Sequence, residues 1–252
     1  MRRFRSVAAI LAAGAALVLL AGWWRSRNVG AVQRGFSAAE RNGCFNCHGP
    51  AGLAGFDGPA AVGTVPALGG ELAGRPLAEA AIRRWILEGR PEAGGEAGAG
   101  REDGGILRMP AFRGVLSARE LDDVVAYVQA VAGGDLPAVG PARDGHEAAS
   151  RLGCFQCHGP AGRGDAPNPG SLKGYIPSWS GLDFPELVRD DGEARAWVLD
   201  SGPRRLREHP LARFFLARQV IKMPAYRGRI SEAEMEAVLA YIRWLRRARA
   251  AG

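Results

Sequence analysis

The sequence predicts an all-α protein made of two tandem copies of one domain after an N-terminal transmembrane helix. The first observation behind this is a ten-residue segment that occurs twice: GCFNCHGPAG begins at Gly43 and GCFQCHGPAG at Gly153, 110 positions later (153 − 43). The second is helical spacing of apolar residues after capping motifs, with few stretches that alternate as β-strands do. The third is an uncharged stretch of 18 residues (24 − 7 + 1), Val7 to Trp24.

The N-terminal segment has the charge distribution of a secretory signal or a signal anchor. Three arginines lie within the first five residues, ahead of the apolar stretch. This stretch is just long enough to span a bilayer, and Trp23 and Trp24 suit the membrane interface. The residues after it make a poor cleavage site. We therefore predict an uncleaved anchor within residues 1–30, in a bacterial inner membrane with the rest of the chain in the periplasm. A cleaved signal and a soluble periplasmic protein are the alternative.

The repeat extends well beyond the duplicated segment, with its motifs in the same order. RWILEGR around Trp85 is matched by AWVLDSG around Trp197, and RMPAFRG by KMPAYRG. A fixed order of motifs at a nearly constant separation indicates a duplicated domain. We predict the first domain over residues 31–133, a Gly- and Pro-rich linker over 134–145 and the second domain over 146–252.

Each domain is predicted to be mostly helical. Ser117 with Glu120, and Ser231 with Glu234, have the spacing of capping boxes, and apolar residues follow both at helical intervals. A shorter helix leads into each cysteine loop and ends at a glycine suited to a left-handed C-cap. A few short helices in a domain of about 100 residues bury a thin core. A bound group that fills the centre of each domain would explain this.

The duplicated loops contain all four cysteines of the chain. In both loops the spacing Cys-x-x-Cys-His is typical of c-type haem attachment; the residues are Cys44, Cys47, His48, Cys154, Cys157 and His158. Two thiols one helical turn apart can add to the two vinyl groups of one porphyrin, and the adjacent imidazole then faces the iron. A zinc site, redox dithiols or disulfides are the alternatives, but none requires a histidine after both pairs. We therefore predict two haem c groups.

Met109 and Met223 are the predicted sixth iron ligands. Each precedes a proline, and they lie 61 and 65 residues after their histidines (109 − 48; 223 − 158). The proline stiffens a non-helical loop, and a thioether favours ferrous iron and so raises the reduction potential. Core filling is the alternative for a methionine, but the equivalent placement of the two favours ligation. His146 and His209 have no histidine counterpart in the other copy and are not expected to bind iron.

Each half of the chain resembles a class I cytochrome c, with Cys-x-x-Cys-His near its start, a Met-Pro loop late and a capped C-terminal helix that carries Tyr127 or Tyr241. Over residues 35–248 the chain resembles a membrane-anchored dihaem cytochrome c. This resemblance implies that the first and last helices of each domain cross and that one haem edge is exposed. It also implies that a proline carbonyl accepts the histidine Nδ1–H. The candidates are Pro169 in the second domain and Pro59 or Pro66 in the first.

The resemblance implies an electron-transfer protein with no catalytic residue of its own, relaying single electrons on the periplasmic face of a membrane. Membership of a larger respiratory or photosynthetic complex is compatible with this role. The alternative is a dihaem enzyme, peroxidase-like or acting on another small molecule. An enzyme of this kind needs an iron with an open or replaceable ligand, whereas methionine on both irons closes the coordination sphere. The sequence contains no hydrolase or phosphate-binding motif.

The net charge of +7 is unevenly distributed. Residues 200–229 contain eight basic and two acidic side chains, whereas residues 88–113 contain four and five. We predict an acidic redox partner that docks at the second haem edge; the residues are Arg204, Arg205, Arg207 and Lys222. Solvated helix faces and pairing with haem propionates are the alternative. No basic run with interleaved aromatic residues indicates nucleic-acid binding.

Overall fold

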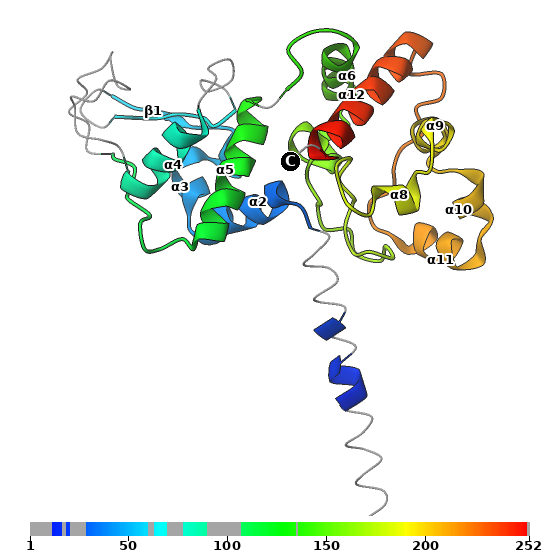
Figure 1. The fold of residues 1–252 in the computed structure, drawn as a ribbon, viewed down its shortest axis with the longest axis horizontal. Coiled ribbons are helices and arrows are strands. Elements are labelled where there is room, and N and C mark those ends of the chain that lie inside the picture. Colours follow the sequence, from blue (N-terminus) through cyan, green and yellow to red (C-terminus); the bar gives the residue numbers. More distant parts are fainter. Residues whose placement is uncertain are drawn as a thin grey trace, which may run out of the picture.

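The structure is a computed structural model that describes residues 12–16, 19–20, 29–59, 63–69, 78–89, 107–134 and 136–250. These residues are mostly helical and form two domains side by side (Figure 1). The predicted helical class and the duplication are confirmed. Besides the helices, the first domain contains one short antiparallel pair of strands among the described residues, β1 (Phe56–Asp57) and β2 (Thr64–Val65). Gly55 directly precedes β1 and Gly63 directly precedes β2; with φ of 59° and 97°, both adopt backbone conformations that other residues avoid.

The helices described in the first domain recur in the same order in the second domain, which has additional helices between them. The first domain contains α2 (Ala31–Arg41), α3 (Cys44–His48), η1 (Pro50–Gly52), α4 (Glu79–Glu88) and α5 (Ala118–Ala132). The second contains α6 (Pro141–Arg151), α7 (Phe155–His158), η2 (Pro160–Gly162), α8 (Phe184–Leu187), α9 (Asp191–Asp200), α10 (Arg204–Glu208), α11 (Pro210–Arg218) and α12 (Glu232–Ala250). Helix α6 begins inside the stretch predicted as a linker, because Pro141 suits the first turn of a helix.

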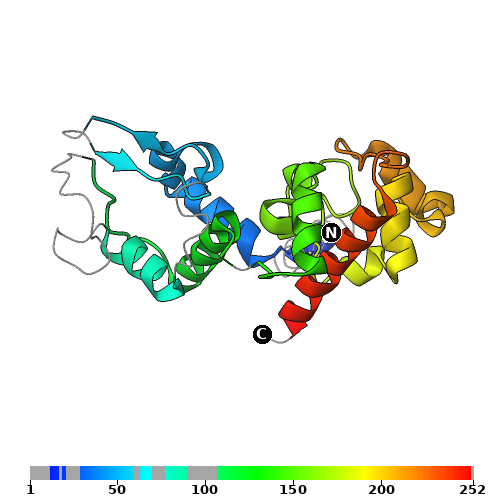
Figure 2. The same ribbon diagram turned by 90° about the horizontal axis from the view of Figure 1, so that it is seen from above.

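The first and last helices of each domain cross in close contact, α2 with α5 and α6 with α12 (Figure 2). Glycines make this possible. A Cβ on Gly35 would overlap the carbonyl oxygen of Asp123, and a Cβ on Gly145 would overlap that of Ala237. The crossing that the resemblance implied is therefore present twice, and in each domain it depends on one glycine in the first helix.

The C-terminal helices bury one apolar face and are capped as predicted. Ser117 and Glu120 form a complete capping box before α5. Before α12, the Ser231 N–H donates to Glu234 at 2.8 Å and the Glu234 N–H donates to the Ser231 hydroxyl at 3.3 Å. The apolar face of α12 lies in the core; its buried residues are Met235, Val238, Leu239, Tyr241, Ile242 and Leu245.

Among the residues that the structure describes, no helix combines the length and the apolar character needed to cross a membrane. Most of the anchor predicted within residues 1–30 lies outside the described residues. Of the apolar stretch, residues 12–16 and 19–20 are described, and they are helical.

Candidate haem-binding sites

Each cysteine loop is a short helical turn that follows the first helix of its domain. Gly43 and Gly153, with φ of 75° and 76°, end that helix and redirect the chain. All four cysteines carry free thiols. Cys44 and Cys154 pack against the cores of their domains, and burial raises the pKa of the Cys154 thiol to about 11. Each loop therefore presents two free thiols, which can together attach one group.

A strained alanine follows each loop and is held by a tyrosine. Ala51 and Ala161 both have φ of 52°, a left-handed conformation that costs a residue with a Cβ roughly 1–2 kcal/mol. The Tyr127 hydroxyl donates to the Ala51 carbonyl at 2.8 Å, and the Tyr241 hydroxyl donates to that of Ala161 at 2.9 Å. The last helix of each domain thereby fixes the chain directly after the histidine.

Both histidine rings are held by proline carbonyls. His48 Nδ1 lies 2.8 Å from the Pro66 oxygen, and His158 Nδ1 lies 3.3 Å from the Pro177 oxygen. Because a carbonyl can only accept, each Nδ1 carries the hydrogen, which leaves the Nε2 lone pair for a metal. Burial lowers the pKa of His158 to about 4, so its imidazole is neutral at neutral pH, as a metal ligand must be.

The proline in the second domain is not the predicted one. Pro169 accepts the N–H of Val220 at 3.0 Å and so holds the loop before Met223 rather than His158. In the first domain Pro66 is the acceptor and Pro59 is not. Aligning the repeats would have found both, since GTVPALGG from Gly63 corresponds to GYIPSWSG from Gly174.

An aromatic cluster lies beside each loop, and His146 belongs to one of them. Phe36 packs on Phe45 and Tyr127 with ring centroids 5.3 and 5.6 Å away. In the second domain His146 occupies the equivalent place, 5.1 Å from Phe155. Burial lowers the pKa of His146, so the ring is neutral and packs as an aromatic residue. His209 caps α11 by accepting the Ala212 N–H at 3.4 Å.

The predicted methionine ligands are half-buried and lie in non-helical, largely exposed loops that are fixed to the preceding helix. The Phe112 N–H donates to the Ile86 carbonyl at 2.9 Å, and the equivalent Tyr226 N–H donates to that of Val198, also at 2.9 Å. The Met109 side chain packs against the core of its domain.

A buried side chain adds a further constraint in the second domain. Asn168, 3% exposed, donates to the Ile221 carbonyl and accepts the Ile221 N–H, each at 2.9 Å. The sequence prediction missed this contact, which spans 53 positions. It holds the loop that leads to Met223.

The donor set of each domain fits a c-type haem. Paired free thiols, an imidazole with Nε2 left for a metal, and a methionine loop recur in the two domains, and each domain is helical with its terminal helices crossed. These features define the class of c-type cytochrome domains, in which thioether bonds attach the haem and histidine binds the iron.

Two family models match the chain. Residues 30–128 match the family described as cytochrome C oxidase, cbb3-type, subunit III, and residues 142–246 match the family described as cytochrome c. The chain is therefore a dihaem c-type cytochrome, whose two domains hold two covalently bound haem c groups and serve haem-based electron transfer. No curated protein and no solved structure matches the chain significantly.

Proposed function

We propose that this cytochrome relays single electrons between redox proteins, with each iron bound by one histidine and one methionine. His48 and Met109 serve the first haem, and His158 and Met223 serve the second. The observation that carries the proposal is the duplication of the whole ligand support: a proline carbonyl on each Nδ1 and a methionine loop bonded to the helix before it. Bound haem supplies the one-electron chemistry, and these residues hold it and exclude water.

The N-terminal segment supports a location on the periplasmic face of a bacterial inner membrane, with the apolar stretch of residues 7–24 as an uncleaved anchor. Membership of a membrane oxidase complex is supported by the description of the family that matches the first domain. In this proposal the partners are an electron donor and an electron acceptor held at the same membrane.

The relay can be distinguished from a dihaem enzyme by the coordination state of the irons. In the oxidised full-length protein we expect the weak long-wavelength absorption band of methionine–iron bonds, removed on adding a strong ligand. We also expect no peroxide turnover by the reduced protein. Rapid peroxide turnover with one methionine band missing would contradict the relay and support the enzyme.

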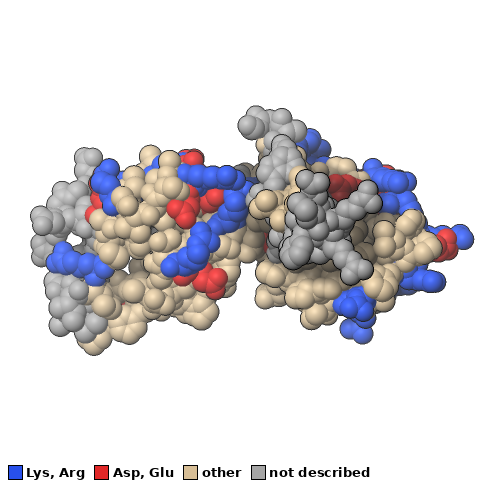
Figure 3. All heavy atoms as spheres, turned by 90° about the horizontal axis from the view of Figure 1, so that it is seen from below, with Lys and Arg blue, Asp and Glu red and all other residues tan. Residues whose placement is uncertain are grey.

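A basic surface, here called the docking surface, lies on the side of the second domain that carries the Met223 loop. Its cations are exposed and come from α10, α11 and the loop that follows: Arg207, Arg213, Arg218 and Lys222. In Figure 3 the blue side chains of this domain, at right, stand mostly around its outer edge, whereas those of the first domain lie among red ones. Arg204, also predicted for this surface, is exposed but pairs with Glu208 one turn along α10 at 2.6 Å. Arg205 does not belong to this surface. It pairs with Glu193 through two bonds of 2.9 Å and thereby lowers the pKa of Glu193 to about 2.

Apolar side chains stand among these cations. Leu211, Phe214 and Val220 are 56%, 53% and 71% exposed, and the Arg218 guanidinium lies 5.2 Å from the Phe214 ring. Exposed apolar residues that lie near cations fit a protein partner with both acidic and apolar surface residues, since the charges steer the encounter and the apolar contact holds it. We assign an acidic redox protein to this surface.

Lys222→Glu is expected to slow electron transfer with the acidic partner about tenfold at low ionic strength, because complementary charge raises association rates by about 10- to 1,000-fold. Stopped-flow reduction against ionic strength measures this. Arg108→Glu is the matched control, since Arg108 precedes Met109 as Lys222 precedes Met223. Equal slowing by both variants, or rates of the unmodified protein that do not change with salt, would contradict docking at the second domain.

A further inference from the structure

A buried carboxylate links the two domains beside the second cysteine loop. Asp165 Oδ2 accepts the N–H of Gly30 at 2.7 Å, and Asp165 Oδ1 accepts that of Ser178 at 2.8 Å. Gly30 directly precedes α2 of the first domain, and Ser178 belongs to the second. Asp165 is 2% exposed. Hydrogen bonds from backbone N–H groups to an ionised carboxylate are about twice as strong as neutral ones, so this contact helps to hold the domains together.

Ser178 lies in the middle of the segment that positions His158. The residue before it, Pro177, accepts the hydrogen bond from Nδ1 of His158. The residue after it, Trp179, packs its ring 5.1 Å from the imidazole. Asp165 therefore fixes the residue whose two neighbours both contact the predicted iron ligand.

The first domain has the same segment but not the carboxylate. Ala67 corresponds to Ser178, 111 positions earlier (178 − 67). Gly55 corresponds to Asp165, 110 positions earlier (165 − 55), and a Cβ on Gly55 would lie only 2.6 Å from the Ala67 nitrogen. Glycine thus stands where the second domain has Asp165. The bond to the neighbouring domain is a property of the second site alone.

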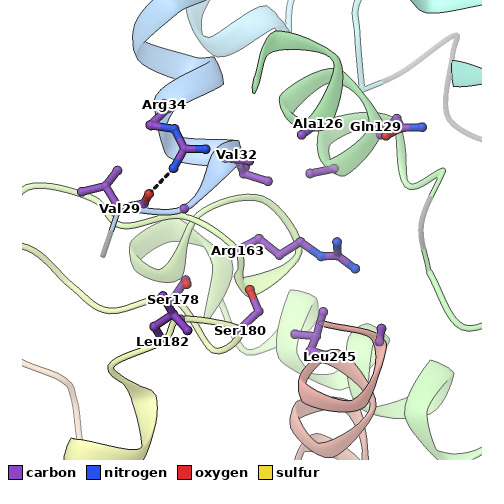
Figure 4. Close-up of a pocket in the computed structure, with 15 residues that line it drawn as sticks. Val29, Val32, Arg34, Ala126, Gln129, Arg163, Ser178, Ser180, Leu182 and Leu245 are labelled. Carbon is purple, nitrogen blue, oxygen red and sulfur yellow. Dashed lines mark hydrogen bonds between the residues drawn. The ribbon is translucent and has the colours of Figure 1, made fainter. Parts of the chain in front are cut away.

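A pocket that is partly open to solvent lies beside this bond. The pocket, of about 420 Å³, lies between the two domains and is lined by Val32 and Ala126 of the first domain and by Arg163 and Leu245 of the second (Figure 4). Helix α5 of the first domain also contacts η2, which directly follows the second cysteine loop. Where this pocket separates the domains, the hydrogen bond between Gly30 and Asp165 is a direct contact that can orient one domain against the other.

The first domain holds its side of the contact rigidly. Arg34, in the first turn of α2, donates to the carbonyl of Val29, the residue before Gly30. The same guanidinium pairs with Asp123 of α5 through bonds of 2.6 and 2.8 Å. The N–H of Gly30 is therefore presented to Asp165 by a segment that is itself tied to the last helix of its domain.

We propose that Asp165 is a positioning residue that clamps the start of the first domain to the histidine-holding segment of the second, fixing the arrangement of the two haem domains and the environment of the second haem. Residues 133–140 join the domains covalently, and the clamp adds a second point of attachment that prevents rotation about this linker. A short linker gives the contact an effective concentration in the millimolar range, so few bonds are needed to close it. The inference rests on the proposed relay.

Two substitutions in the full-length, haem-loaded protein test the clamp. Asp165→Asn removes the charge and one acceptor. We expect the midpoint potential of the second haem to rise while that of the first is unchanged, because a less firmly held Pro177 carbonyl makes the imidazole less basic. Gly30→Pro removes the N–H between the domains and places the proline Cδ where that hydrogen met Asp165 Oδ2, so the contact is both lost and sterically blocked. The φ of −70° at Gly30 is one that proline adopts. Gly30→Ala keeps the N–H and is the matched control; its Cβ would lie 3.3 Å from Asp165 Oδ2, a tight contact that a shift of a few tenths of an ångström relieves.

Pulsed EPR on the two ferric haems measures whether their separation is fixed. We expect a narrow distance distribution in the unmodified protein and in Gly30→Ala, and a broad one in Gly30→Pro and Asp165→Asn, with electron transfer between the haems slowed severalfold. Narrow distributions in all four proteins, or equal potential shifts at both haems of Asp165→Asn, would overturn the clamp. If Asp165→Asn does not retain its second haem, the distance distribution of Gly30→Pro alone tests the clamp. If the distance distributions stay narrow while every variant keeps two attached haems and intact methionine bands, the clamp fails and the relay stands.

Discussion

Valine in place of Gly145 is expected to prevent folding of the second domain while the first still folds and attaches its haem. A Cβ at this position would overlap the carbonyl oxygen of Ala237 and lie 2.9 Å from the Tyr241 Cβ. Helices α6 and α12 would have to separate, and α12 would no longer bring Tyr241 to the carbonyl of Ala161. Overpacking costs roughly 1–3 kcal/mol in side-chain cores. A clash with the backbone exceeds this and approaches the whole stability of a small domain, about 5–15 kcal/mol.

Haem content per chain, together with thermal unfolding of the two domains, measures the effect. One haem and one unfolding transition are expected for Gly145→Val. Gly134→Ala is the control, because its nearest neighbour is the Gln129 carbonyl oxygen at 3.8 Å, an ordinary contact. Two haems and an unchanged second transition in Gly145→Val would mean that the close crossing of α6 and α12 is not needed.

Histidine in place of Met223 is expected to lower the midpoint potential of the second haem by roughly 0.2 V, a quarter of the range of about 0.8 V over which axial ligands set the potential. A thioether favours ferrous iron, and a second imidazole does not. The loop offers a fixed place for the new side chain, since Tyr226 and Asn168 hold it from both ends. Met109→His is expected to do the same to the first haem only. Spectroelectrochemical titration resolves the two potentials.

Met235 provides the control for this substitution, since it is buried in α12 at 1% exposure and is not a predicted ligand. Met235→Leu should leave both potentials in place. If Met223→His leaves the second potential unchanged although haem is attached, Met223 is not an iron ligand.

Much of the site was predictable because it depends on residues close together in the sequence. The spacing in each cysteine loop is contained in five consecutive residues, and the capping boxes span four. The helix crossing was expected from the resemblance, but the glycines that permit it were not singled out. What a residue such as Gly35 faces depends on a helix more than 80 positions away, and local spacing does not contain that information.

The errors arose at contacts that are distant in the sequence. Pro169 lies nearer to His158 in the chain than Pro177 does, yet the fold uses it to hold Val220. Arg205 contributes to the local positive charge, but α9 presents Glu193 to it and removes it from the docking surface. In both cases the sequence could not show which residue of a given type lies close to a partner, because the fold sets that distance.

By itself the sequence determined the duplicated helical architecture and the chemistry of the two haem attachment loops, because both are encoded in short motifs whose geometry follows from the local backbone. Only the tertiary structure decided which carbonyl holds each histidine, that His146 packs as an aromatic residue, and that Asp165 joins one domain to the other. These depend on atoms brought within hydrogen-bonding distance by the packing of whole helices, and Gly30 and Asp165 are 135 positions apart.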